Sequence, residues 1–444
     1  MDIILDNKSP KYLELFEEIK KLINNNTLKG GDKLPSKRSL SRDLNISINT
    51  VINAYNLLLD EGYIYSIEKS GYYVTKQPII TISNNYKVNK ITNDNNIIYD
   101  FSTANINSFN CKSYNKVMKE ILLEENYLNK ANLIGDLNLR LAIKTHLAIN
   151  RNINVSENQI IIGSGMEMLE DILPLLEINN ITLENPGYHK LKYLFNNKEF
   201  TINYQNLDNE GIIIPKNRTI LYTTPFNQFP TGIKMTISRK KELADFAIKT
   251  NSYIIEDDFD AEFRINGSPT TSIISLIPNN VIFFSTFSTT LFPGLRIAYT
   301  ILPFDLINKY TKSFKGYSNI VPTLNQLALA RFISEGYYAT YLNRKKKEYL
   351  RKRNLIINLL NQLNISVDEK RNYLSLVIKL NLNNYNDFKK ELNDNKILIN
   401  SFSDYDEYKK ESNYFLLGYT SIEDDRLIEG INILKNLIDK YKIK

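Results

Sequence analysis

Basic and amide side chains gather between residues 33 and 56 with a spacing that suits nucleic acid. Lysine and arginine come first, and asparagines then recur at intervals of three or four residues: Lys33, Lys37, Arg38 and Arg42, followed by Asn49, Asn53 and Asn56. Lysine and arginine bind phosphates, and an asparagine amide pairs bidentately with adenine in the major groove. The segment therefore predicts a surface that binds a duplex and contacts its bases.

Three helices and a hairpin are predicted to position these side chains. A first helix follows Pro10, because apolar residues recur there at helical spacing. Ser36 caps a second helix over 37–44, and Ser47 caps a third helix. The buried face of this third helix is predicted to be Val51, Ala54, Tyr55 and Leu58.

A hairpin is predicted behind the third helix. Its strands are Tyr63–Ile67 and Gly71–Val74, and its tip, residues 68–71, can lie along a minor groove. The predicted DNA contacts are Lys33, Ser36, Lys37, Arg38, Ser47, Asn49, Thr50, Asn53, Lys69, Ser70 and Gly71.

This region resembles the GntR-type winged helix. The matching motifs are Pro35-Ser36-Lys37-Arg38, Ser47-Ile48-Asn49-Thr50-Val51, Glu61-Gly62-Tyr63-Ile64 and Ser70-Gly71-Tyr72-Tyr73-Val74. The resemblance implies DNA binding. The family usually has arginine where this chain has Ile48, so we expect a preference for A·T-rich sites. The alternative is a small helical domain with solvated asparagine and lysine side chains.

The length of 444 residues predicts at least two domains. We assign a DNA-binding domain to 1–77, a polar linker to 78–97 and a larger domain to 98–444. Within the larger domain, a large subdomain reaches about residue 330 and a small C-terminal subdomain begins at about residue 340. Continuous apolar runs are typical of a parallel sheet covered by helices, and they occur at Gln159–Ile162, Asn180–Leu183, Thr219–Tyr222, Ser252–Ile255, Val281–Phe284 and Ile297–Leu302.

Composition excludes several classes of protein. Cys111 is the only cysteine, which excludes an internal disulfide and suits a reducing cytoplasm. Two histidines and one cysteine leave too few ligands for a His/Cys metal site. No apolar run reaches about 18 residues, so no transmembrane helix is expected. The net charge of +7 is spread along the chain, so the prediction of DNA binding rests on where individual basic residues lie.

The order of motifs in residues 98–444 resembles a fold-type-I, pyridoxal-phosphate aminotransferase. The motifs are Gly163-Ser164-Gly165, Glu184-Asn185-Pro186-Gly187-Tyr188, Gln228-Phe229-Pro230-Thr231-Gly232, Glu256-Asp257-Asp258-Phe259 and the run from Ser285 to Arg296. Joined to a GntR-type head, this arrangement is similar to the MocR/GabR-like regulators. The resemblance implies an α/β fold with a mostly parallel sheet and a small C-terminal α/β subdomain.

The cofactor of that family needs a lysine amine for its Schiff base. The resemblance places this lysine at Thr289, and no lysine lies between Lys249 and Lys309. A threonine hydroxyl cannot form an imine, so we expect pyridoxal phosphate to have been lost as a covalent cofactor, and transamination with it. Other departures agree with this loss: Phe259 for a tyrosine, Met166 and Glu167 for the Ser and Gln of the phosphate cup, Leu416 for the substrate arginine and Asn227 for a histidine.

Other positions match the family. Asp257 matches the acid on the pyridine nitrogen, Ser288 and Arg296 match phosphate ligands, and Tyr188 matches a loop tyrosine. Asp257 is equally well explained as a fold-stabilising carboxylate, and Arg296 as half of a structural ion pair. The predicted vestigial cofactor site or effector pocket comprises Gly165, Tyr188, Asn227, Asp257, Ser288, Thr289 and Arg296.

These features together predict a cytoplasmic transcriptional regulator that binds a double-stranded DNA operator and has no enzymatic activity. The larger domain is expected to form the homodimer, and any small-molecule effector to bind non-covalently. The alternatives are an active pyridoxal-phosphate enzyme, a regulator that retains and responds to this cofactor, and a dimerisation scaffold without a ligand. The basic stretch 344–353 is interpreted as the solvated face of a long helix rather than a second DNA-binding surface.

Overall fold

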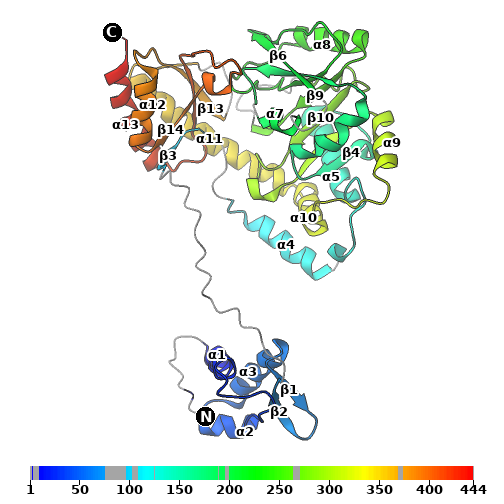
Figure 1. Cartoon of the computed structure of the whole chain (residues 1–444), viewed down its shortest axis with the longest axis vertical. Coiled ribbons are helices and arrows are strands. Elements are labelled where there is room, and N and C mark those ends of the chain that lie inside the picture. Colours follow the sequence, from blue (N-terminus) through cyan, green and yellow to red (C-terminus); the bar gives the residue numbers. More distant parts are fainter. Residues whose placement is uncertain are drawn as a thin grey trace. The chain divides into compact units, whose positions relative to one another are not determined.

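The computed structural model describes residues 3, 10–75, 97–102, 109–124, 126–188, 190–195, 200–263, 271–368 and 374–443. The chain forms two compact units, Met1–Asn93 and Asp94–Lys444, which we call the head and the body (Figure 1). Apart from Ile97, the predicted linker over 78–97 lies outside the described residues. No helix in the described ranges is long and apolar enough to cross a membrane.

The head is a three-helix unit followed by a hairpin. Its helices are α1 (Lys11–Asn24), α2 (Lys37–Asp43) and α3 (Ile48–Asp60), and its antiparallel strands are β1 (Ile64–Ile67) and β2 (Gly71–Val74). The predicted face of α3 is buried, with Val51, Ala54, Tyr55 and Leu58 fully inaccessible. Ser36 and Ser47 cap α2 and α3 as predicted, because each hydroxyl accepts a bond from the backbone N–H three residues later.

An eight-stranded sheet forms the centre of the body. Its order is β4-β11-β10-β9-β8-β5-β6-β7, and the strands are β4 (Ile160–Gly163), β5 (Asn180–Asn185), β6 (Thr201–Asp208), β7 (Gly211–Ile212), β8 (Ile220–Thr223), β9 (Tyr253–Asp257), β10 (Val281–Thr286) and β11 (Ala298–Ile301). All six predicted strands are present. The prediction of a mostly parallel sheet is confirmed, because β6, β5, β8, β9 and β10 pair in parallel. Strand β11 departs from it and runs antiparallel to both β10 and β4.

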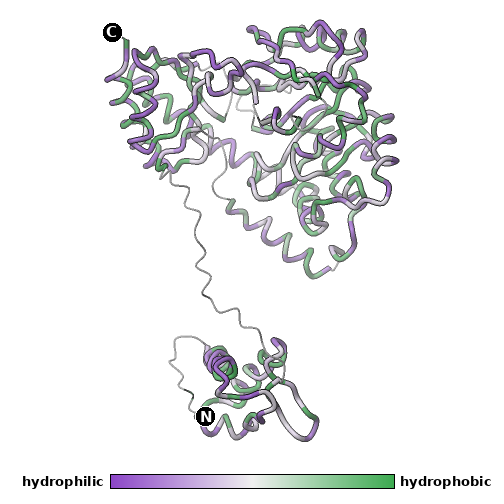
Figure 2. Tube along the Cα trace, viewed as in Figure 1, coloured by the Kyte–Doolittle hydropathy of each residue, from purple (hydrophilic) through white to green (hydrophobic). Residues whose placement is uncertain are grey.

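Helices cover both faces of this sheet. Ile160 and Ile162 belong to one hydrophobic cluster and Ile161 to another, so successive residues of one strand enter opposite cores. The helices of the large subdomain are α4 (Lys112–Glu124), α5 (Leu137–Arg151), α6 (Leu169–Ile172), α7 (Lys190–Phe195), α8 (Ile237–Thr250), α9 (Phe304–Ser313) and α10 (Thr323–Ser334). Outer helices such as α4 alternate between hydrophilic and hydrophobic residues (Figure 2).

The small C-terminal subdomain has its own four-stranded sheet in the order β12-β13-β16-β15. Its elements are β12 (Ser366–Val367), β13 (Ser375–Lys379), β14 (Ile397–Leu398), β15 (Asn400–Ser401), β16 (Tyr414–Gly418), α12 (Tyr385–Asp394) and α13 (Asp424–Tyr441). Strand β3 (Tyr99–Asp100) pairs with β14 in parallel. The first described residues of the body therefore pack against its C-terminal part.

The long helix α11 (Tyr337–Gln362) carries the basic stretch 344–353. Arg344 and Lys347 are exposed, as a solvated face requires, but Lys352 and Arg353 are buried. The Lys352 ammonium donates a hydrogen bond to the carbonyl of Ile422 at 2.6 Å. The interpretation as a purely solvated face was thus wrong for these two residues, which pack inside the body.

The body also contains short 3-10 turns. They are Asn126–Leu128, Glu157–Gln159, Met166–Met168, Leu173–Leu176, Ala261–Phe263, Pro293–Leu295 and Phe402–Tyr405.

Candidate functional sites

The first turn of α3 presents polar and apolar groups to solvent. The Ser47 hydroxyl accepts a bond from the Thr50 N–H at 3.1 Å, and the two hydroxyls lie 2.8 Å apart. These contacts fix the first turn. Asn49 and Asn53 are exposed on the side of α3 away from its buried face. This arrangement suits a recognition helix, in which N-terminal side chains contact base edges.

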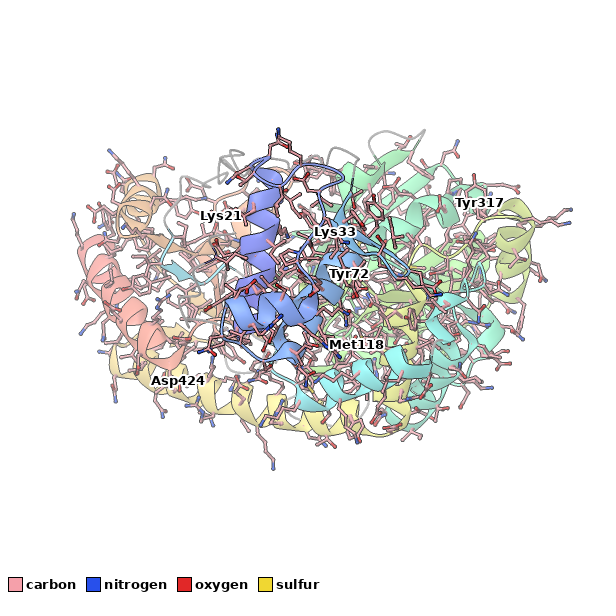
Figure 3. All side chains as sticks on the ribbon, turned by 90° about the horizontal axis from the view of Figure 1, so that it is seen from below. Lys21, Lys33, Tyr72, Met118, Tyr317 and Asp424 are labelled. Atoms are coloured by element: carbon pink, nitrogen blue, oxygen red, sulfur yellow. The ribbon has the colours of Figure 1, made fainter. Side chains whose placement is uncertain are left out.

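Residues before α2 extend the hairpin sheet, and Lys33 and Lys37 lie against its tyrosine rings. The backbone N–H of Leu34 donates to the carbonyl of Tyr72, and that of Val74 donates to the carbonyl of Asp32. The Lys33 ammonium lies 5.7 Å from the ring centre of Tyr73, and the Lys37 ammonium lies 4.8 Å from that of Tyr72. Figure 3 labels Lys33 and Tyr72 in the head. Positive charge therefore lies beside the hairpin, where phosphate contacts are expected.

The start of α2 is tied to α3 from inside the head. The hydroxyl of buried Tyr55 donates a hydrogen bond to the carbonyl of Pro35 at 2.8 Å. Ser36 and Arg38 remain exposed beyond this anchor. The bond therefore relates the basic start of α2 to the recognition helix.

The hairpin tip, residues 68–71, contains two residues in left-handed backbone conformations. Lys69 has φ of 59° and Gly71 has φ of 128°. Glycine adopts such a value without the cost that a Cβ would add, and a Cβ at Gly71 would also lie 3.3 Å from Cε of Lys33. The hydroxyls of Ser70 and Tyr73 share a hydrogen bond at 2.7 Å. The tip is thus a tight turn that leaves Lys69 exposed.

In the body, Asp257 ends β9 and is buried. The Tyr222 hydroxyl donates a hydrogen bond to Oδ2 of Asp257, whereas Oδ1 has no hydrogen-bond partner among the described residues. Burial raises the pKa of Asp257 to about 7, although the bond from Tyr222 opposes this shift. Asp257 therefore retains an unused acceptor or, when protonated, a donor.

Two further buried oxygens at predicted site residues have no partner. Asn227 donates from Nδ2 to Oδ2 of Asp260 at 2.9 Å, but its own Oδ1 accepts no bond from any described residue. The hydroxyl oxygen of Ser288 is also unpartnered. Burial raises the pKa of Asp260 to about 8. Buried polar groups are normally satisfied, so these oxygens are available to a ligand or to water.

A rigid frame of buried hydrogen bonds surrounds these residues. The carboxylate of Glu184 accepts bonds from the side chains of Thr223, Thr224 and Gln228 at 2.6 to 3.1 Å. Asp258, next to Asp257, forms a buried two-bond ion pair with Arg151. The carboxylate oxygens of Glu184 and Asp258 thus accept hydrogen bonds, in contrast to the unpartnered oxygens of Asp257 and Asn227.

At the predicted phosphate cup, Arg296 is bound by a carboxylate. Nη2 of Arg296 lies 2.9 Å from both Oε1 and Oε2 of Glu167, and both side chains are about half exposed. Gly165 has φ of 151°, and a Cβ there would lie 2.3 Å from Oε2 of Glu167. The Arg296–Glu167 pair therefore closes over the Gly165 backbone.

Phe259 and Leu416, which the sequence analysis predicted to be departures from the aminotransferase pattern, lie in one apolar cluster. Leu416, 1% exposed, belongs to a hydrophobic cluster with Val377 and Phe402, against which Phe229 and Phe259 pack. Thr289 is half-buried, and Tyr188 is exposed and forms a T-shaped ring contact with Phe229. Among the described residues, no three His, Cys, Asp or Glu side chains come together as a metal site.

Both the head and the body match known protein families. Residues 11–74 match the gntR family of bacterial regulatory proteins, and residues 98–410 match aminotransferase class I and II. The chain is 34% identical to the HTH-type transcriptional regulator YdeL of Bacillus subtilis over 368 residues, or 78% of each chain. The chain belongs to the MocR-like transcriptional regulators of the GntR family.

Other relatives agree with this assignment. The probable rhizopine catabolism regulatory protein MocR of Rhizobium meliloti is 25% identical, with 98% of this chain and 95% of that protein covered. A pyridoxine biosynthesis transcriptional regulator, PdxR of Corynebacterium glutamicum, is 26% identical over 79% of each chain. The body shares its fold with a multiple substrate aminotransferase from Thermococcus profundus (TM-score 0.69, 20% identity, 78% of this chain and 92% of that chain).

The structure of this MocR-like regulator gives two of the predicted residues partners that the sequence did not indicate. Asp257 and Tyr222 are in direct contact, as are Asn227 and Asp260, but the sequence analysis missed Tyr222 and Asp260. The position of Tyr222 in the sequence could have indicated this contact, because Tyr222 lies one residue before the end of β8, and β8 pairs with β9. The Glu167–Arg296 contact was also missed.

Proposed function

We propose that this regulator binds its operator through the head and uses a body that has lost covalent catalysis. The observation that carries the proposal is the absence of any lysine between Lys249 and Lys309, with Thr289 directly after Ser288. Without a primary amine at this point, pyridoxal phosphate has no group for a Schiff base. The cytoplasm, where operators lie, is the proposed location.

The packing around Phe259 and Leu416 supports this proposal. An arginine for a substrate carboxylate needs a polar surrounding, whereas Leu416 lies in an apolar cluster with Phe259 and Phe229. Leucine at residue 416 and phenylalanine at residue 259 are therefore compatible with each other, since a charge at residue 416 would be buried among aromatic rings. A cluster adapted in this way suits a body that no longer binds an amino-acid carboxylate for transamination.

Reversible ligand binding is part of the proposal. Asp257 and Asn227 are buried and each has an oxygen without a partner, as does Ser288. These groups suit a small molecule with N–H or O–H donors, which would shift the population of two head arrangements. The same oxygens favour the second candidate, a regulator that responds to non-covalently bound pyridoxal phosphate. The Arg296–Glu167 pair opposes that candidate, because it occupies the arginine that a phosphate would need.

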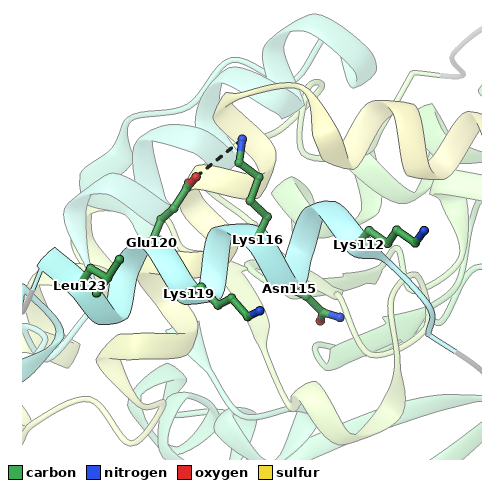
Figure 4. A pocket seen from close by; sticks show the side chains of 6 residues that line it. All are labelled: Lys112, Asn115, Lys116, Lys119, Glu120 and Leu123. Atoms are coloured by element: carbon green, nitrogen blue, oxygen red, sulfur yellow. Dashed lines mark ion pairs between the residues drawn. The ribbon is translucent and has the colours of Figure 1, made fainter.

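Dimerisation through the body is proposed from exposed apolar side chains. Leu122 and Leu123 on α4, Leu128 after it, and Leu137 and Leu141 on α5 are all 40% exposed or more. These segments pack around α10. Figure 4 shows Leu123 near Glu120 on α4, and Glu120 forms an ion pair with Lys116 at 3.6 Å. We expect Leu123→Glu to shift the full chain from dimer to monomer in sedimentation, and Ile248→Glu, at a 58% exposed site on α8, to leave it unchanged.

Borohydride reduction with pyridoxal phosphate tests the loss of covalent chemistry. After reduction and peptide mass spectrometry of the full chain, we expect no pyridoxyl adduct on peptides of the Asp257 site. The double variant Thr289→Lys and Phe259→Tyr is expected to carry the adduct at residue 289 if the rest of the site accepts the cofactor. An adduct on a site peptide of the native chain would overturn the proposal.

A further inference from the structure

Ile48 is an apolar side chain that the head leaves in water. It is the first residue of α3 and is 40% exposed. The Ser47 cap sets its backbone, while the hydroxyls of Ser47 and Thr50 are engaged with each other at 2.8 Å. The outward groups of this first turn are therefore the Ile48 side chain and the amide of Asn49.

Helical spacing extends this pair into two neighbouring stripes. Ile48 and Ile52 are four residues apart, as are Asn49 and Asn53, so each pair lies along one line of the helix surface. Ile52 is half-buried, whereas Ile48, Asn49 and Asn53 are exposed. The N-terminal turn of α3 thus offers an apolar contact directly beside amide groups.

A·T pairs present the matching groups in the major groove. Adenine offers N7 and N6 to an asparagine amide, and thymine presents its C5 methyl group to an apolar side chain. A G·C pair presents no such methyl group. An exposed isoleucine is a poor partner for guanine, since it has no donor for guanine O6 or N7.

We propose that Ile48 contacts the C5 methyl group of a thymine in the operator, next to an adenine bound by Asn49 or Asn53. This inference rests on the DNA-binding function and adds the residue and base group that set specificity. Burying one methyl group against an isoleucine predicts about a fourfold gain in affinity.

Deoxyuridine substitution tests the contact, because this base lacks only the methyl group. The full chain first selects duplexes from a randomised pool, and each thymine of the selected duplex is then replaced singly by deoxyuridine. We expect one thymine in each half-site where the replacement weakens native binding about fourfold. We expect the Ile48→Ala variant to bind the thymine duplex and the deoxyuridine duplex with equal, weakened affinity. The Ile48→Val variant should still bind the deoxyuridine duplex more weakly than the thymine duplex.

Ile67→Ala is the matched control, since Ile67 is an isoleucine of the head hairpin that is 45% exposed. This variant should respond to deoxyuridine as the native chain does. The inference is overturned if no deoxyuridine effect depends on residue 48, or if the selected duplexes carry guanine where the thymine is expected. If the full chain enriches no duplex from the pool, the proposed DNA binding is contradicted, and the contact of Ile48 with thymine is contradicted as well.

Discussion

Arg296 and Glu167 form an ion pair in which Nη2 of the arginine lies 2.9 Å from both carboxylate oxygens. The two residues are 129 positions apart in sequence. The resemblance predicts Arg296 as a phosphate ligand, and we propose that the Glu167 carboxylate competes with a phosphate for this arginine. The pair is about half exposed, which keeps its strength modest.

Glu167→Gln is expected to strengthen non-covalent binding of pyridoxal phosphate by the full chain. Removing the carboxylate frees Arg296 and removes repulsion of the phosphate, worth at most about 1 kcal/mol or roughly a fivefold gain at such an exposed pair. Absorbance titration measures the affinity. Glu177→Gln is the control, because Glu177 forms an exposed pair with Lys309 at 3.1 Å. Equal affinity of native protein and Glu167→Gln would show that Glu167 does not compete with the phosphate.

Leu416→Arg is expected to destabilise the body, even though it introduces the arginine of the active family. Leu416 is 1% exposed within an apolar cluster, so the new charge would be buried without a partner. We expect a loss of roughly 3 kcal/mol in the free energy of unfolding, measured by chemical denaturation. Ile248→Arg on α8, where Ile248 is 58% exposed, should change stability little. A stable Leu416→Arg protein would mean that the space for a substrate arginine has been kept.

The pH dependence of stability is expected to change in Asp257→Asn. Burial raises the pKa of Asp257 to about 7 in the folded chain, against roughly 3.9 when unfolded. Between these values the folded state holds a proton that the unfolded state releases, so stability is present at low pH and declines as pH rises toward 7. The variant lacks this proton and should lose less stability between pH 5 and 8.

Thermal unfolding across this pH range measures the difference. Each pKa unit corresponds to about 1.4 kcal/mol, so the effect amounts to a few kcal/mol. Exposed Asp245 provides the control Asp245→Asn, which should follow the native profile. Parallel profiles for native protein and Asp257→Asn would show that Asp257 is already ionised in the folded body.

Lys37→Gln is expected to reduce the salt dependence of DNA binding. If Lys37 neutralises one phosphate, the slope of log affinity against log salt should fall by about 0.9. Fluorescence anisotropy with a selected duplex at several salt concentrations gives the slope. Lys20→Gln should leave the slope unchanged, because Lys20 pairs with Glu61 at the end of α3 opposite its N-terminal turn. A slope unchanged by Lys37→Gln would place this lysine outside the phosphate contacts.

The fold of the head could be predicted because its signals are local. Ser36 and Ser47 bond to backbone three residues away, and the turn at Gly71 joins adjacent strands. In the body, the six continuous apolar runs revealed buried strands. Strand β6 escaped prediction because its residues alternate between half-buried and exposed, and no continuous apolar run marks it.

The sequence by itself determined that a DNA-binding head precedes an aminotransferase-like body, and that residue 289 carries no amine. Only the tertiary structure decided that β11 runs antiparallel, that Glu167 binds Arg296 and that Tyr222 binds Asp257. The physical reason is distance along the chain. Caps and helical faces follow from neighbouring residues, whereas contacts between residues 35 or 129 positions apart depend on how the sheet is assembled.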